Sequence, residues 1–416
     1  MTGCDIGPKG SGKLRNLNIA GARALVVAPK GSISRAAAGS ESTETEFLKQ
    51  LDDGSWVKVR MSDEEGEKID KTPPDEIYNA TDDWLFIAWG FWKEDAVNTW
   101  WSHFNIDEAY LVNKSNGDAY DITEVGIPHR YNGYNRIRGF GDVFTDKNGN
   151  IYYNNGAIVK ITVGKTQATA EWIVSSDLFY VLEFAVDNDG NILYYRNDAN
   201  YRIRTAGGVT LPLPDDKKPS GVLGYNGHIY TNSLYNSMGG NKFCKVEITG
   251  DTIDDIIISP VEIIDSFGQN QYLYSIMIEG YNVKRFIFPD KMVIINGDMR
   301  SIFTIYKNGS QPKVVSLDNY LGGSKSITAG SKDIFVWSEK SIFTADPETG
   351  ITTTKVSATD YDLIYRFEVT FNDVIIINAL TFDGKKILAN IYPDGRKEIL
   401  SESMDETKTL MLVKVR

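Results

Sequence analysis

Two stretches of the chain gather side chains that could bind a ligand. The first runs from Trp84 to Phe104 and holds five of the eight tryptophans, and its mixed polar part carries Trp92, Trp100, Trp101 and His103. Aromatic rings on a loop offer flat faces on which sugar rings or a partner's side chains can stack. The alternative is that these rings only cap a gap beside the preceding strand, in which Trp84 and Trp89 are expected to pack.

The second stretch, from His129 to Arg138, combines arginines with tyrosines, namely Arg130, Tyr131, Tyr134, Arg136 and Arg138. Guanidinium groups bind carboxylates in a bidentate manner, so this cluster suits a carboxylate or an acidic glycan. An ordinary solvated loop is the competing interpretation. Because the two stretches follow one another closely in the chain, they could share one rim of the fold.

No local pattern predicts a catalytic residue, a metal site or a cofactor. The three histidines are isolated, without the spacing of a zinc site, and Cys244 follows Phe243 in a strand and is expected in the core. The Asp/Gly turns at Asp146 and Asp187 lack the twelfth-position Glu of an EF-hand, so they are interpreted as hairpin turns. Carboxylates that converge from distant segments would escape such a search.

Charge and hydropathy exclude several classes of partner. The net charge is −12 without a phosphate-neutralising Lys/Arg cluster, which argues against nucleic acid. The longest uncharged apolar run, Trp84 to Trp92, is too short for a membrane span. Met1 to Cys4 is similar to the end of a bacterial lipoprotein signal, which predicts lipidation at Cys4 and contact with a membrane only through that anchor. An incidental cysteine in an exposed tail is the alternative.

The elements that must position these side chains repeat along the chain. Val143 to Tyr153 and Phe184 to Tyr195 each read as an apolar strand, an Asp/Asn/Gly turn and a second apolar strand, and they are spaced about 40 residues apart. Looser copies occur further on, at 227–230, 292–295, 333–337 and 373–377. A period of this length with about four strands per unit is typical of β-propeller blades.

Two irregular units upstream, at 24–59 and 84–122, bring the number of candidates to eight. We therefore predict an all-β fold, a single β-propeller of mostly four-stranded antiparallel blades, with eight blades and seven as the alternative. Residues 1–20 are predicted to form an N-terminal tether and residues 21–416 the propeller. We expect ring closure to pair an N-terminal strand with the final blade.

The residues Phe184 to Tyr195, continuing through Asn200 to Arg204, carry a resemblance to NHL-type propeller repeats. In such repeats an Asp-x-Asp-Gly-Asn turn precedes an Asn-x-Arg-Ile segment. Together with Met1 to Cys4, the chain resembles exported propeller lipoproteins of Bacteroidetes. The resemblance implies a fold and an extracytoplasmic place, either outer-membrane-anchored or periplasmic, and brings no catalytic motif with it.

The expected function is that of a non-catalytic binding propeller, with a glycan or a protein as ligand at one mouth of the ring. A carbohydrate-active enzyme, either a hydrolase or a lyase with carboxylates meeting in the funnel, is the alternative. A cytosolic interaction scaffold is the third hypothesis. The sequence leaves open whether the chain is an enzyme and which ligand it takes.

Overall fold

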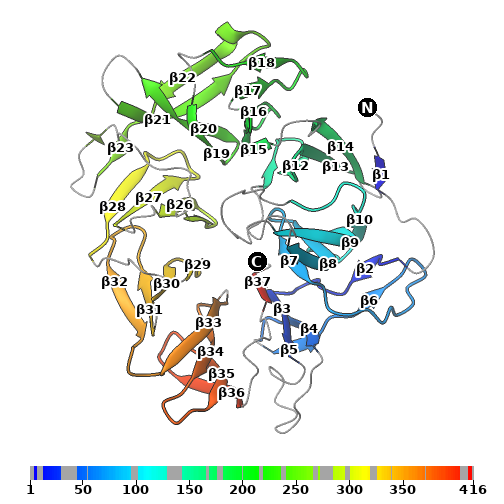
Figure 1. Ribbon diagram of the computed structural model, residues 1–416, viewed down its shortest axis with the longest axis vertical. Helices are drawn as coiled ribbons and strands as arrows, with labels where there is room; N and C mark the ends of the chain where they lie inside the picture. The colour runs from blue at the N-terminus through cyan, green and yellow to red at the C-terminus, as the bar shows by residue number, and fades with distance from the viewer. Residues whose placement is uncertain are drawn as a thin grey trace. The chain divides into compact units, whose positions relative to one another are not determined.

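The strands of the protein are seen in a computed structural model. The structure describes residues 4–6, 13–29, 45–53, 55–94, 102–128, 143–164, 168–175, 181–198, 200–214, 219–235, 240–265, 270–271, 284–295, 300–318, 326–338, 340–370, 372–402 and 411–414. These residues form an all-β chain whose main sheets are the blades of an eight-bladed β-propeller (Figure 1). The eight-bladed prediction is therefore confirmed, and the seven-bladed alternative is not needed.

The first four blades are antiparallel sheets. Blade 1 consists of β3 (Ala24–Pro29), β4 (Thr45–Gln50), β5 (Trp56–Lys58) and β37 (Met411–Lys414). Blade 2 consists of β7 (Glu76–Asn79), β8 (Trp84–Glu94), β9 (Ser102–Asn113) and β10 (Ala119–Asp121). Blade 3 consists of β11 (Val143–Thr145), β12 (Ile151–Asn154), β13 (Ile158–Val163) and β14 (Ala168–Val174). Blade 4 consists of β15 (Val181–Val186), β16 (Ile192–Arg196), β17 (Tyr201–Arg204) and β18 (Thr210–Pro212).

In each of the other four blades, the four strands are neighbours in chain order. Blade 5 consists of β19 (Pro219–Tyr225), β20 (His228–Tyr235), β21 (Gly240–Ile248) and β22 (Ile256–Pro260). Blade 6 consists of β25 (Lys284–Ile287), β26 (Lys291–Ile295), β27 (Ser301–Tyr306) and β28 (Lys313–Ser316). Blade 7 consists of β29 (Ser326–Ala329), β30 (Ile334–Ser338), β31 (Ser341–Ala345) and β32 (Thr352–Val356). Blade 8 consists of β33 (Leu363–Val369), β34 (Ile375–Leu380), β35 (Lys386–Ile391) and β36 (Lys397–Glu402).

Short elements lie outside the regular four-strand pattern. β1 (Cys4–Ile6) adds a strand beside β14, with Cys4 opposite Ala170. The remaining ones are β2 (Asn16–Leu17), β6 (Met61–Ser62), β23 (Ile263–Ile264), β24 (Asn270–Gln271) and the short helix η2 (Ile253–Asp255). Leu14, Leu17 and Ile19 are buried, so this part of the segment predicted as a tether contributes apolar side chains to the core.

Ring closure differs from our expectation. The final blade is completed by its own four strands, and the C-terminal strand β37 instead pairs with β3 of the first blade, with Val26 opposite Leu412. β4 pairs with one edge of β3, and β37 covers the other edge, for which blade 1 has no earlier strand. A closed pairing of this kind removes exposed backbone donors and acceptors.

Blade packing explains why many strands are apolar at every position. In β34, Ile375 and Ile377 belong to a cluster that also contains Phe335 and Trp337 of blade 7. Ile376, which alternates with them, is also buried, at 3% exposure. Because successive side chains of a strand point to opposite faces, a strand covered on both faces is apolar throughout.

The chain divides into two compact units. One comprises residues 1–10, 84–111 and 120–283, and the other residues 11–83, 112–119 and 284–416. Each unit has buried apolar clusters between its own consecutive blades, such as blades 4 and 5 in the first unit and blades 7 and 8 in the second. A search of the described residues found no helix with the length and apolar character needed to cross a membrane.

Candidate functional site

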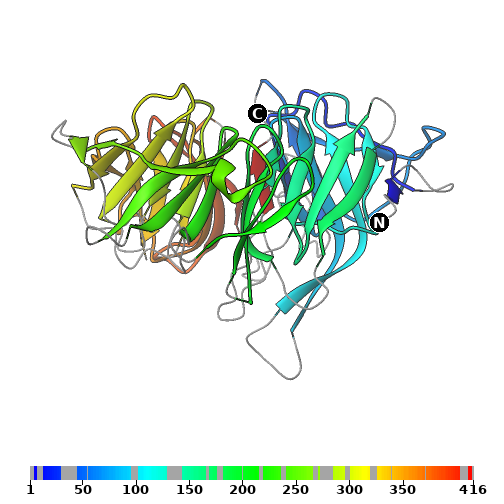
Figure 2. The same cartoon turned by 90° about the horizontal axis from the view of Figure 1, so that it is seen from above.

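The hairpin formed by β8 and β9 is the most prominent candidate for a binding element. Its strands have 11 and 12 residues, whereas a typical strand has about 5 or 6. Leu85 to Trp89 are buried, but Phe91 is 56% exposed only two residues further on. Figure 2 shows the two strands, coloured light blue to cyan, continuing as a hairpin past the neighbouring strands of blade 3.

Ring contacts anchor the inner part of this hairpin. Phe86 packs edge-on against Tyr153 of β12, with ring centroids 5.3 Å apart. Trp89 packs against Tyr110 at 6.0 Å, and Trp84 packs against Tyr120 at 5.7 Å. Trp84 and Trp89 are therefore packing residues, as predicted, and their contacts lie within blade 2, whereas Phe86 joins the hairpin to blade 3.

The structure places the predicted binding residues only in part. Trp92 belongs to the projecting strand β8 and His103 to the projecting strand β9. Cys4 is the first residue of β1. The other predicted residues lie outside the described residues, namely Trp100, Trp101, Arg130, Tyr131, Tyr134, Arg136 and Arg138. Their roles stay predictions.

The described residues that flank the Arg/Tyr stretch lie at one end of blade 3. On its N-terminal side, the carbonyl oxygen of Gly126 accepts a hydrogen bond of 2.9 Å from the hydroxyl of Tyr153. On its C-terminal side, Val143 pairs with the same Tyr153. Tyr153 is near the end of β12, at the turn from second to third strand, and β8 and β9 are the second and third strands of blade 2. The chain therefore enters and leaves the Arg/Tyr stretch at the blade end that corresponds to the projecting hairpin.

Phe91 is the residue that sequence analysis did not single out. It belongs to the apolar run that ends at Trp92, and in that run it looks like another core position. The length of the apolar run could have indicated this, because a strand that continues past Gly90 is longer than a typical blade strand. Only the structure shows that Trp89 is buried and that Phe91, two residues further on, is exposed.

The Asp/Gly motif has a structural role in the turn from β11 to β12. One carboxylate oxygen of Asp146 accepts hydrogen bonds from the backbone N–H groups of Asn148 and Asn150, at 2.8 and 3.1 Å. Its other oxygen accepts from the Asn150 amide and from the Tyr152 hydroxyl. Gly149 has a φ of 79°, a backbone angle that residues with a Cβ rarely adopt. The carboxylate therefore serves the turn, as expected for a hairpin.

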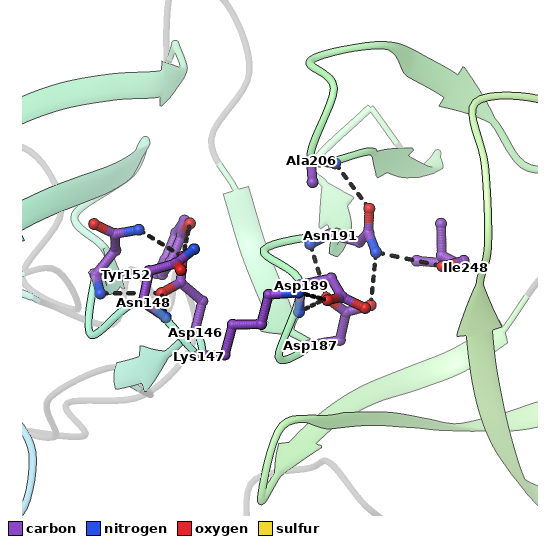
Figure 3. A network of polar contacts seen from close by, with 10 residues as sticks. Asp146, Lys147, Asn148, Tyr152, Asp187, Asp189, Asn191, Ala206 and Ile248 are labelled. Atoms are coloured by element: carbon purple, nitrogen blue, oxygen red, sulfur yellow. Dashed lines mark hydrogen bonds and ion pairs between the residues drawn. The ribbon is translucent and has the colours of Figure 1, made fainter.

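The turn from β15 to β16 repeats this arrangement and is bonded to its neighbours. Asp187 accepts from the N–H groups of Asp189 and Asn191 and from the Asn191 side chain (Figure 3). The N–H of Lys147 donates to the carbonyl of Asn188 at 2.9 Å, and the N–H of Asn188 donates to the carbonyl of Gly227 at the same distance. We call the contacts between the turns at 146–150 and 187–191 the Asp-turn junction.

Charge in the Asp-turn junction is set by burial and by one exposed ion pair. Burial raises the pKa of Asp187 above its usual value, although three hydrogen bonds to its carboxylate act in the opposite direction. Lys147 forms an ion pair with Asp189 at 2.5 Å, and the pair is largely exposed. Among the described residues, no group of three or more His, Cys, Asp or Glu side chains is placed to hold a metal ion.

A different polar contact joins blades 6 and 7. The carboxylate of Glu348 accepts hydrogen bonds from the Lys291 ammonium and the Tyr306 hydroxyl, both at 2.7 Å. Lys313 donates to the backbone carbonyl of Glu348 at 2.7 Å. Burial alone would raise the pKa of Glu348, but the bonds from Lys291 and Tyr306 outweigh it and lower the pKa below its usual value. We call this contact the Glu348 junction.

Comparisons with known proteins report only distant likeness. No protein-family model matches the chain, and no curated protein matches it. Apo AztD from Citrobacter koseri aligns over 96% of this chain and 98% of its own, with 11% identity and a TM-score of 0.44. PorZ, a surface component of the type-IX secretion system of Porphyromonas gingivalis, aligns over 82% of this chain and 54% of its own, with 11% identity and a TM-score of 0.39.

A third solved structure, a eukaryotic initiation factor, covers 98% of this chain and 91% of its own, with 10% identity and a TM-score of 0.42. These three proteins bear unrelated descriptions. At such identities and TM-scores no function transfers to this chain.

Proposed function

We propose that the chain is a non-catalytic binding propeller that uses the β8–β9 hairpin to recognise a glycan or a protein. The observation that carries the proposal is the exposed Phe91 on a hairpin that outruns its blade, with Trp92 and His103 on the same projecting strands. An aromatic ring exposed on a projecting element is well suited to stacking on a sugar ring or on an apolar group of a partner.

The Arg/Tyr stretch supports an acidic ligand. Gly126 and Val143, which border it, contact the same Tyr153 at the corresponding end of blade 3. Arginines of this stretch would bind carboxylate groups while the aromatic hairpin stacks on the ligand. The recognition surface in this proposal therefore combines a projecting aromatic element with cationic groups from the next connection.

The proposed cellular place is extracytoplasmic, through lipidation at Cys4. The support is the Met1 to Cys4 sequence, and on the Phe184 to Tyr195 repeat we assign the blades to the NHL-like type. Incorporation of labelled fatty acid into the protein expressed from its own genomic locus, and its loss in Cys4→Ala, is the expected result. A wild-type chain that takes up no label contradicts the anchor and leaves the binding proposal standing.

Glycan-array binding and hydrolysis screens test the binding function. We expect Phe91→Ala and the double variant Trp100→Ala/Trp101→Ala each to weaken ligand binding about tenfold, as the loss of one good aromatic contact implies. Trp172→Ala is the matched control, because Trp172 is 45% exposed but lies within β14, the fourth strand of blade 3, and not in a turn at that end of a blade. Equal affinity of all variants rejects the hairpin, and release of cleaved sugar favours the enzyme alternative.

A further inference from the structure

Strand β1 fixes the backbone of Cys4 to the outer edge of blade 3. The fourth strand of that blade is β14, and β1 pairs with it as a fifth strand, with Cys4 opposite Ala170 and Ile6 opposite Ala168. The residue for which we propose lipidation is thus the first residue of a strand that the blade holds in place.

An exposed tryptophan lies beside this position on β14. Trp172 follows Ala170 by two residues and is 45% exposed, whereas Ala168 and Ala170 are 0% and 2% exposed. Since β1 begins at Cys4, its pairing with β14 stops before Trp172. The positions of Cys4 and Trp172 are diagonal neighbours in an antiparallel pair, and such positions are about 7–8 Å apart.

The charges next to Trp172 nearly balance. Glu171 precedes Trp172 in β14, and its carboxylate lies 3.7 Å from the ammonium of Lys160, the opposite residue in β13. Asp5 in β1 adds a carboxylate to the same edge. Because these residues together carry a slight excess of negative charge, the edge matches zwitterionic lipid headgroups better than anionic ones.

We propose that the outer edge of blade 3, at Cys4 and Trp172, lies against the membrane surface with the Trp172 indole in the headgroup region. This inference rests on the proposed lipidation at Cys4. A lipid on the Cys4 sulfur is joined to the backbone by a few covalent bonds, so a paired β1 keeps the blade at the bilayer. The polar layer on each side of a bilayer is about 5–8 Å deep, comparable with the spacing of the two positions.

The chemistry of tryptophan fits this layer. Indole combines an apolar body with one N–H donor, and tryptophan is enriched where membrane meets water. The contact of the protein with the membrane then extends beyond the anchor itself. A strand of another protein, added to the edge of β14 beyond Ala170, is the competing occupant.

Quenching of tryptophan fluorescence by brominated lipid tests this contact. The protein expressed from its own genomic locus is purified with its lipid and reconstituted in phosphatidylcholine vesicles with and without bromine on the acyl chains. We expect brominated vesicles to quench the wild type and Trp172→Phe to lose most of that quenching. The control is Trp56→Phe, which should keep it, because Trp56 is a half-buried residue of β5 in blade 1.

A second variant tests the part played by β1. A flexible Gly/Ser spacer inserted between Asp5 and Ile6 keeps Cys4 for lipidation but releases it from β14. The quenching by brominated lipid should then fall as it does in Trp172→Phe. A spacer variant quenched as strongly as the wild type contradicts the role of β1.

The outcomes separate this contact from the anchor. A lipidated protein that floats with the vesicles, but whose quenching is the same with Trp172→Phe, overturns the Trp172 contact and leaves the anchor standing. A strand of another protein on this edge would give that result, since it shields Trp172 from lipid. A protein that carries no lipid and does not float with the vesicles contradicts the anchor and this inference together.

Discussion

The Asp-turn junction and the Glu348 junction both join consecutive blades, but they are built in opposite ways. In the first, Asp146 and Asp187 accept hydrogen bonds mainly from their own turns, and the blades are joined by backbone bonds such as Lys147 N–H to Asn188. In the second, the Glu348 side chain reaches Lys291 and Tyr306, which are 57 and 42 residues away in the chain.

This difference shows which parts of a propeller can be recognised from a short stretch of sequence. The Asp-turn junction repeats a local motif, since the donors of Asp187 lie two and four residues after it. The Glu348 junction has no local motif, because its four side chains come from β26, from β27, from β28 and from the turn after β31. Both junctions join one blade to the next, but only the Asp-turn junction contains a motif that can be recognised in the sequence.

The largest expected effect compares one glycine from each junction. A Cβ on Gly350, beside Glu348, would lie 2.1 Å from the carbonyl oxygen of Ser316, and Gly350 has a φ of 74°. A Cβ on Gly149 would meet nothing within 4 Å at a φ of 79°. We expect Gly350→Ala to lower the free energy of unfolding by about 3 kcal/mol or more, and Gly149→Ala by about 1 kcal/mol, in urea denaturation.

The reason is that a backbone carbonyl cannot turn aside as a side chain can, so the blade contact itself must open. Equal losses for the two variants would mean that the cost is conformational strain alone. The two junctions would then not differ in how closely the next blade packs against their turns.

The next effect concerns charge. Glu348→Gln removes the anion beside Lys291, whose side chain is only 11% exposed, while keeping the size of the side chain. We expect a loss of about 1.5 kcal/mol, the scale of a hydrogen bond to a charged group that is partly solvated. Asp189→Asn is the control in the Asp-turn junction, where the exposed pair with Lys147 should leave the urea midpoint unchanged. A larger shift for Asp189→Asn would reverse the order of the two junctions.

The smallest effect is a pH dependence of opposite sign. The pKa of Glu348 is lowered in the fold, so its contribution is present above its usual value of 4.5 and lost as pH falls through the lower folded value. The pKa of Asp187 is raised, so its contribution is present below its usual value of 3.8 and lost as pH rises through the higher folded value.

Urea denaturation over this acidic range, with Glu348→Gln and Asp187→Asn beside the wild type, measures both. As pH falls, the stability advantage of the wild type over Glu348→Gln should shrink, and the wild type should gain relative to Asp187→Asn. Parallel curves for the three chains would show that neither carboxylate changes its proton affinity on folding.

Much of the fold could be predicted because blades repeat. The Asp/Asn/Gly turns and the apolar runs at 143–153 and 184–195 appear as the hairpins β11–β12 and β15–β16. The closing strand was assigned to the wrong end of the chain. Residues 411–414 and 24–27 both look like edge strands, and nothing local says which sheet each completes.

For the candidate binding site, the sequence predicted only the approximate stretch of chain. Tryptophan density indicated the 84–104 stretch, and the structure adds that its strands project and that Phe91 is exposed. The ring of Phe86 packs against Tyr153 of blade 3, which is 67 residues away in the chain, and no local spacing predicts where such contacts with the next blade stop.

The repeat, the turns and the high strand content of this protein follow from local sequence, because hairpin turns and strand alternation depend on neighbours a few residues apart. The closing strand, the partners of Glu348 and the exposure of Phe91 on the β8–β9 hairpin are visible only in the folded chain. Each of these depends on contacts between distant segments, whose pairing energy is shared among many residues and leaves no fixed spacing in the chain.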